Sequence, residues 1–163
     1  GSALRSRGIE PFLRRFTDQL THHLLGASAE SPLPAVEAYR AQLAAARVPV
    51  AELAKTEVLS QSPDSYEPFI AEGGKPRRAA AEAALQLSPR PRMGDRVSYY
   101  ITPKSKGRTA DWQRARPLAL YDAQKEPYAV EYYLEKLDDW LDRYGRFLGA
   151  PTRPPSGEQG ELF

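Results

Sequence analysis

Positively charged side chains are the residues of this chain with the clearest chemical potential, because they are concentrated in one stretch. Residues 75 to 116 hold eleven Lys or Arg and three Asp or Glu, a net charge of +8. The rest of the chain has a net charge of −6, so the overall value of +2 conceals a strong asymmetry. Clustered cations can neutralise phosphates and release the counterions that a polyanion carries. A polyanion-binding surface is therefore our first hypothesis, and a solvated basic surface without a ligand is the alternative.

Acidic residues and histidines form no pattern typical of catalysis or metal binding. Nucleotidyl transfer needs paired carboxylates that hold two magnesium ions, whereas Asp138 and Asp139 are adjacent in an expected helix and point in different directions. The only histidines, His22 and His23, have no third ligand at a metal-binding spacing. Cysteine is absent, and so are phosphate-loop, nucleophile-elbow and dinucleotide-binding motifs. We therefore expect no catalytic residue, no metal and no cofactor in this chain.

The composition is that of a folded domain. With 163 residues, of which 41% are hydrophobic, the chain can bury a core of ordinary size, and we expect one domain with two lobes. No apolar run reaches the roughly 20 residues of a membrane span and no secretion signal is present, which predicts a cytoplasmic protein with no membrane partner. Gly1-Ser2 is typical of an expression remnant, and Ala3 starts as if inside a domain. These features favour a fragment of a larger protein.

Helical periodicity dominates the sequence. An apolar residue at every fourth position predicts a helix over residues 10–25, and Gly26 is expected to end it. A single further turn is expected at 50–53, after Pro49. Similar patterns, ended by Pro or Gly, predict three more helices, over residues 34–47, 76–87 and 129–148. The last of these has the longest apolar stripe, with acidic residues on its outer side.

Two stretches have extended character. Residues 96 to 103 alternate apolar and polar side chains, which is typical of a half-buried strand with Val97, Tyr99 and Ile101 facing the core. Residues 55–60 predict a shorter extended segment, and residues 104–108 predict a loop with three cations and no acid. The expected fold is therefore mainly α with a small β element, an α+β arrangement.

Five short motifs follow one another along the chain. They are Pro11-Phe12-Leu13-Arg14-Arg15-Phe16, Thr56-Glu57-Val58-Leu59-Ser60 followed by Tyr66, Pro76-Arg77-Arg78-Ala79-Ala80, Met93-Gly94-Asp95-Arg96-Val97-Ser98-Tyr99-Tyr100-Ile101, and Glu131-Tyr132-Tyr133-Leu134-Glu135-Lys136. In this order they resemble the C-terminal thumb region of bacterial family B DNA polymerases. The resemblance covers roughly residues 3 to 148.

Two positions depart from the family pattern. Where the family often has a V-R-R-D-W stretch before the first helix, this chain has Leu4-Arg5-Ser6-Arg7-Gly8, which keeps the basic character and loses the Asp and the Trp. The family's P-H-V after its tyrosine is replaced by Gly73-Gly74-Lys75-Pro76. The resemblance is therefore to a divergent bacterial branch.

The resemblance implies a helical, non-catalytic thumb that closes over the primer–template duplex and holds its phosphates, mostly across the minor groove and without sequence specificity. The catalytic aspartates and their magnesium would belong to the palm of the parent polymerase. A helical thumb lobe over 3–90 would be followed by a strand, basic loop and closing helix over 91–149. The expected DNA-binding residues are Arg5, Arg7, Lys75, Arg77, Arg78, Lys104, Lys106, Arg108 and Arg114.

The end of the chain suggests a second, separate binding function. Pro and Gly residues make 150–163 a poor candidate for packed structure, so a flexible tail is expected. Its last five residues, 159–163, resemble the Q-x-x-L-F peptide by which bacterial polymerases dock on the sliding clamp. Leu162 and Phe163 are a bulky apolar pair suited to a partner's pocket, and Gln159 would bond at its rim. An arbitrary polar tail that ends in Leu-Phe is the alternative.

Two other classes of function stay open from the sequence alone. The helices could form an adaptor that recruits a partner through the C-terminal peptide, with the basic stretch incidental. A small hydrolase that uses Asp64, Glu67 and His22 is a third alternative. Roles in replication and in repair are equally compatible with the resemblance, which places the protein at the nucleoid.

Overall fold

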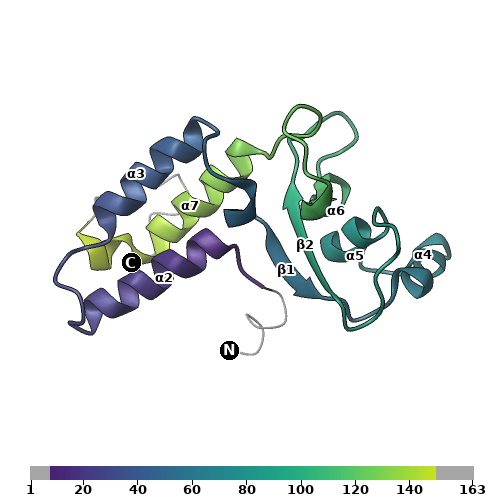
Figure 1. The fold of residues 1–163 in the computed structure, drawn as a ribbon, viewed down its shortest axis with the longest axis horizontal. Helices are drawn as coiled ribbons and strands as arrows, with labels where there is room; N and C mark the ends of the chain where they lie inside the picture. Colours follow the sequence, from purple (N-terminus) through teal and green to yellow (C-terminus); the bar gives the residue numbers. More distant parts are fainter. Residues whose placement is uncertain (1–7, 150–163) are drawn as a thin grey trace, which may run out of the picture.

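Two lobes, one of helices and one built on a small sheet, make up residues 8–149, the part of the chain that this computed structural model describes (Figure 1). The helical lobe contains α2 (Pro11–Leu24), α3 (Leu33–Ala44) and α7 (Val130–Tyr144). The other lobe contains a three-stranded antiparallel sheet in the order β1 (Lys55–Val58), β2 (Arg96–Ile101), β3 (Ala115–Pro117), with α4 (Pro63–Ala71), α5 (Ala79–Ala84) and α6 (Asp111–Arg114) beside it. The expected class, mainly α with a small β element, is confirmed.

Helix α2 matches its prediction to within one residue at each end. Pro11 occupies its first turn, where a missing N–H costs nothing. At the other end Gly26 has a φ of +78°, and the N–H of Ala27 donates to the carbonyl of His22 at 2.9 Å. This arrangement is a Schellman cap, which uses the freedom of glycine to enter the left-handed region. The apolar stripe is buried from Phe12 to Leu20 as expected, but Leu24 at its end is 54% exposed, which the pattern did not predict.

Helix α3 ends three residues earlier than predicted. Ala46 adopts a φ of +57°, and the N–H groups of Ala46 and Arg47 donate to the carbonyls of Leu43 and Gln42. The same kind of cap therefore forms here on a residue that is not glycine. Composition favoured continuing the helix through the alanines, because alanine at that position carries no sequence signal for a cap.

The last helix returns to the first two. Trp140 of α7 lies 6.0 Å from Phe16, between ring centroids, and its indole N–H donates to Thr17 at 3.0 Å. Arg40 of α3 binds Asp138 of α7 through two contacts, of 3.0 and 3.1 Å. The helical lobe is thus assembled from both ends of the described chain, and the sheet lobe lies between them in the sequence.

Helix α7 itself is shorter than predicted. It ends at Tyr144, and a 3₁₀ turn, η3 (Gly145–Leu148), follows it. Gly149, with a φ of +76°, ends that turn as the sequence indicated. Among residues 8–149, no helix is long and apolar enough to cross a membrane.

Strand β2 is the centre of the sheet, and it is buried on both faces. Val97, Tyr99 and Ile101 are in the core as predicted, but Tyr100 is 1% exposed and Thr102 is 6% exposed. The half-buried prediction was wrong for these two residues. Tyr100 packs edge-on against Tyr121 and its hydroxyl donates to the carbonyl of Glu126 at 2.8 Å. The loop that contains Tyr121 and Glu126 therefore covers the face of β2 that the alternating pattern predicted to be polar.

Several short elements of the sheet lobe differ from expectation. Helix α4 was not among the predicted helices; the hydroxyl of its N-cap, Ser62, caps the N–H of Ser65. Helix α5 spans 79–84 instead of 76–87, because Arg78 has extended backbone dihedrals. Helix α6 and strand β3 have no periodic signal, since four and three residues are too few to show one. Single 3₁₀ turns form at η1 (Val50–Glu52), as predicted, and at η2 (Leu118–Leu120).

Replacing Tyr133 tests the connection between the helical lobe and the sheet. Its hydroxyl accepts a hydrogen bond from the buried N–H of Ile101 at 2.9 Å. We expect Tyr133→Phe to lower the free energy of unfolding by about 1–3 kcal/mol, because that N–H would lose its partner away from water. The control is Tyr132→Phe, whose hydroxyl contacts the exposed Asp111 at 3.3 Å. It should change the value by less than about 0.5 kcal/mol in urea denaturation, and equal losses would contradict the assignment.

Candidate nucleic-acid interface

Helix α6 joins two basic segments that are far apart in the sequence. The guanidinium of Arg77, which precedes α5, lies over the ring of Trp112 in α6, 4.4 Å from its centroid. The basic loop 104–108 leads directly into α6. The structure therefore brings residues 75–78 and 104–108 to the same region, which the sequence alone could only suggest through charge.

The basic loop is held to α6 by one side chain. The carboxamide oxygen of Gln113 accepts hydrogen bonds from the N–H groups of Thr109 and Ala110, both at 3.0 Å. Its amide nitrogen donates to the carbonyl of Gly107 at 2.9 Å. Within the loop, Ser105 and Arg108 exchange backbone hydrogen bonds, and Gly107 has a φ of +79°. The loop is thus a fastened turn, which reduces the conformational entropy lost when its cations meet an anion.

Tyr66, from the sequence motif that begins at Thr56, positions the other basic segment. Its hydroxyl accepts from the N–H of Arg78 at 3.0 Å and donates to the Glu82 carboxylate at 2.7 Å. Glu82 also pairs with Arg77 at 3.4 Å. Burial, followed by the bonded carboxylate, raises the pKa of Tyr66 to about 12. The motif therefore acts here through the packing and the hydrogen bonds of Tyr66, which position the basic segment.

Most cations of the basic stretch are exposed and make no ion pair. Arg77, Arg90, Arg114 and Arg116 have carboxylate partners. Within the described part of the chain, the other seven have exposed side chains and no ion pair: Lys75, Arg78, Arg92, Arg96, Lys104, Lys106 and Arg108. Cations without internal partners keep their full charge for an outside anion. Arg92 and Arg96 were not among the predicted site residues.

Arg114 does not belong to this surface. It is 3% exposed, its Nε donates to the carbonyl of Thr102 at 2.8 Å, and its guanidinium lies 5.3 Å from the centroid of the Tyr132 ring. Glu131 approaches it at 3.5 Å. The guanidinium thus links Thr102, just beyond β2, to Glu131 and Tyr132 of α7, and little of it is exposed to an outside phosphate. Sequence could not separate it from its neighbours because all of them are arginines or lysines in one basic stretch.

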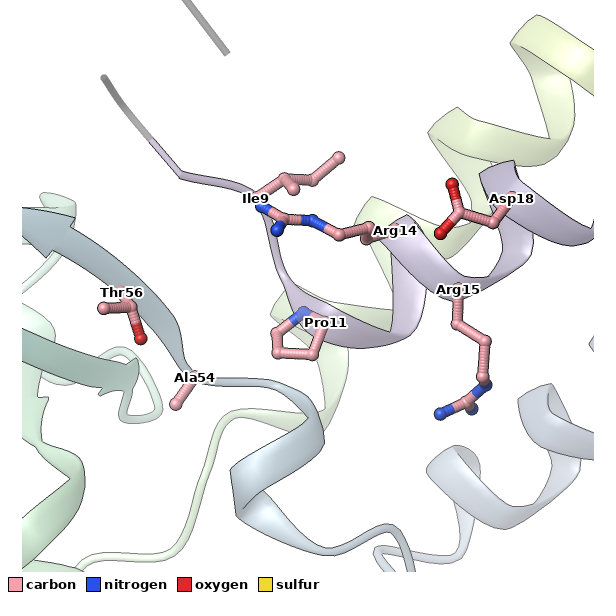
Figure 2. A pocket seen from close by; sticks show the side chains of 7 residues that line it. All are labelled: Ile9, Pro11, Arg14, Arg15, Asp18, Ala54 and Thr56. Carbon is pink, nitrogen blue, oxygen red and sulfur yellow. The ribbon is translucent and has the colours of Figure 1, made fainter. Parts of the chain in front are cut away.

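Figure 2 shows a second basic region, at the start of α2, which sequence analysis did not assign to the site. A pocket of about 310 Å³ lies between α2 and β1. Arg15 is held by Glu52 at 3.3 Å and lies over the ring of Tyr39. Arg14 extends toward Ile9 instead, and within the described residues it has no ion pair (Figure 2). The adjacent Arg14 and Arg15 of the first motif are the sequence signal that could have identified this region.

The proposed hydrolase residues are not assembled. Asp64 and Glu67 of α4 both bind Arg90 at 3.1 Å. His22 lies in the last turn of α2, at the opposite end of the molecule (Figure 1). Residues 8–149 contain no group of three His, Cys, Asp or Glu that could hold a metal. The remaining predicted residues, Arg5 and Arg7 at one end and Gln159, Leu162 and Phe163 at the other, lie outside the described residues.

Comparison with known proteins relates the fold to a polymerase. No family model matches the sequence, and no curated protein does. Fifty-nine chains of solved structures match the fold. One is the family B DNA polymerase from the hyperthermophilic archaeon Pyrobaculum calidifontis, with a TM-score of 0.59 and 18% sequence identity. The similarity covers 90% of this chain and 18% of that polymerase. The fold is thus similar to part of a family B DNA polymerase, as the sequence motifs implied.

The pH dependence of the stability of a Tyr66→Phe variant tests whether Tyr66 anchors the basic segment. Because the folded pKa of Tyr66 is raised to about 12 and the unfolded value is about 10, the neutral hydroxyl stabilises the fold fully below about pH 10. That contribution is lost as pH rises toward 12. We expect wild type to be more stable than Tyr66→Phe at pH 8 and the gap to narrow above pH 10, in urea denaturation. A gap that stays constant, or widens, would contradict the assignment.

Proposed function

We propose that this chain is the thumb of a family B DNA polymerase of a bacterial branch, and that it holds the primer–template duplex through its phosphates. The observation that carries the proposal is the convergence of exposed, unpaired cations around α6, on a fold similar to part of a family B polymerase. The order of the five sequence motifs supports the same assignment. The parent enzyme would act at the nucleoid, in replication or repair.

Phosphate contact is the mode of binding that these residues favour. Lys104, Lys106 and Arg108 stand on a turn that Gln113 holds in place, and Lys75 and Arg78 stand on a segment that Tyr66 holds. Ammonium and guanidinium groups bind phosphate oxygens of any sequence, so such contacts position a duplex without selecting bases. Arg92, Arg96 and Arg14 are further exposed cations without an ion pair among the described residues.

Catalysis would take place outside this chain. The carboxylates of the sheet lobe that could attract magnesium, such as Asp64 and Glu67, are paired with Arg90. In the proposed polymerase the aspartates and their magnesium belong to the palm, and this chain contributes grip. It would polymerise nothing by itself, because positioning without an activated nucleophile supplies no chemical step.

A salt series tests the grip on DNA. We expect the affinity for a fluorescent primer–template duplex, measured by anisotropy, to fall linearly on logarithmic axes with salt. Removing two loop cations, in Lys104→Ala/Lys106→Ala, should reduce the slope by about 1.8, because each phosphate contact contributes about 0.9. The matched control is Arg47→Ala/Arg143→Ala, which removes two exposed cations outside the basic stretch.

The control variant should keep the wild-type slope. Absence of duplex binding at low salt, or an affinity independent of salt, would overturn the proposal and favour the adaptor alternative. An equal loss of slope in both variants would show that the net charge of the chain, and not the surface around α6, attracts DNA.

The C-terminal peptide is proposed to dock on a bacterial sliding clamp, on the strength of its sequence. We expect Leu162→Ala/Phe163→Ala to weaken binding to a purified bacterial clamp at least about tenfold, since apolar anchors in a pocket carry most of the energy of such contacts. Glu161→Ala, within the same peptide, is the control and should bind as wild type. Neither change should alter duplex affinity. Unchanged clamp binding by the double variant would remove this part of the proposal.

A further inference from the structure

An open groove lies beside the basic loop, between α5 and α6. Its volume is about 540 Å³, and residues from four segments line it, among them Gln86, Arg108, Trp112, Arg116 and Glu126. Most of these side chains are polar, and Trp112 is the one aromatic ring in the lining. Contacts to phosphates come from cationic and polar groups, so an aromatic ring in this groove offers a different kind of contact.

The charges of the groove leave one cation available. Arg116 pairs with Glu126 at 3.0 Å, and Glu82 pairs with Arg77 at 3.4 Å. Arg108 is the remaining charged residue of the lining, and it has no ion pair within residues 8–149. The groove is therefore suited to a ligand with a single anionic group near Arg108 and a neutral body.

Trp112 provides a surface on which a flat ring can stack. Its side chain is half-buried, and the Arg77 guanidinium lies over one face of the indole, 4.4 Å from the ring centroid, so a base would stack on the other face. Bases stack on aromatic side chains and on guanidinium planes irrespective of their sequence. In a paired duplex the bases are stacked on one another, so a base that reaches Trp112 must be unpaired.

The spacing between the ring and the free cation is held by hydrogen bonds. Gln113, next to Trp112, binds the backbone of residues on both sides of Arg108, at Gly107 and Thr109. The Ser105–Arg108 bridge closes the same turn. The groove therefore presents a stacking surface and an anion-binding group in one preorganised arrangement, as nucleotide sites require.

We propose that this groove binds one unpaired nucleotide of a DNA strand, with the base on Trp112 and the phosphate at Arg108. Polar side chains such as Gln86 would meet the edges of the base. The choice of DNA rests on the proposed function, whereas the choice of an unpaired nucleotide rests on the groove. The inference adds a single-strand contact to the duplex grip, so the chain would bind a junction between paired and unpaired DNA better than a blunt duplex.

Tryptophan fluorescence tests this directly, because the chain has two tryptophans in different surroundings. Trp140 is 6% exposed and bonded to Thr17, so a ligand in the groove does not reach it. We expect oligo-dT to quench the emission of Trp112, and a blunt duplex with the same number of phosphates to leave it nearly unchanged. Trp112→Phe should abolish the quenching, since only Trp140 then emits.

Affinity measurements with variants complete the test. Trp112→Leu should weaken oligo-dT binding about fivefold or more, from the lost stacking, and Trp112→Phe should retain part of it. Arg108→Ala should lower the affinity but leave the quenching at saturation. Urea denaturation followed through Trp140 checks that each variant is folded, and the wild-type comparison of oligo-dT with duplex needs no variant.

The outcomes separate this inference from the proposed function. Equal quenching by oligo-dT and blunt duplex, no quenching by either, or an unchanged oligo-dT affinity of a folded Trp112→Leu would overturn the inference. Salt-dependent duplex binding without quenching leaves the proposed grip intact and removes the groove site. Quenching by oligo-dT without any duplex binding supports the groove site and removes the proposed grip.

Discussion

The buried backbone of β2 is the constraint on which the structure depends. As the central strand, covered on both faces, it must satisfy its polar groups away from water. Tyr133 of α7 accepts the N–H of Ile101, and Arg114 binds the carbonyl of Thr102 just beyond the strand. Tyr133 comes from α7 of the helical lobe, whereas Arg114 comes from α6 of the sheet lobe, twelve residues beyond Thr102. The hydrogen bond from Ile101 to Tyr133 therefore holds the sheet lobe and the helical lobe in one arrangement, because water cannot reach the buried N–H to replace it.

The basic surface follows from that arrangement. Because Arg114 is drawn inward to Thr102, the short helix α6 is fixed against the sheet with Trp112 toward α5 and Gln113 toward the basic loop. The buried Arg114 thus helps to fix the position of α6 and of the exposed cations on the basic loop that Gln113 holds to it. Arg114 is almost inaccessible, so its role in the structure is to position neighbouring segments, whereas most other cations of the stretch are exposed.

Sequence reasoning was most accurate for long periodic elements and least accurate for short ones. The stripe of α2 and its glycine cap are properties of neighbouring residues, and they were predicted to within one residue. The early end of α3 at Ala46 and the burial of Tyr100 were missed. In each case the deciding contact is either a cap without its usual residue or a cover supplied from a distant segment.

By itself, the sequence determined the helical character of the chain, the segregation of positive charge into residues 75–116 and the order of the polymerase-like motifs, because composition and local spacing carry that information. Only the tertiary structure decided that residues 75–78 and 104–108 meet at α6, that Arg114 is buried and that Trp112 lines a groove beside Arg108. The physical reason is that burial and proximity depend on contacts between residues tens of positions apart, and local patterns do not encode such contacts.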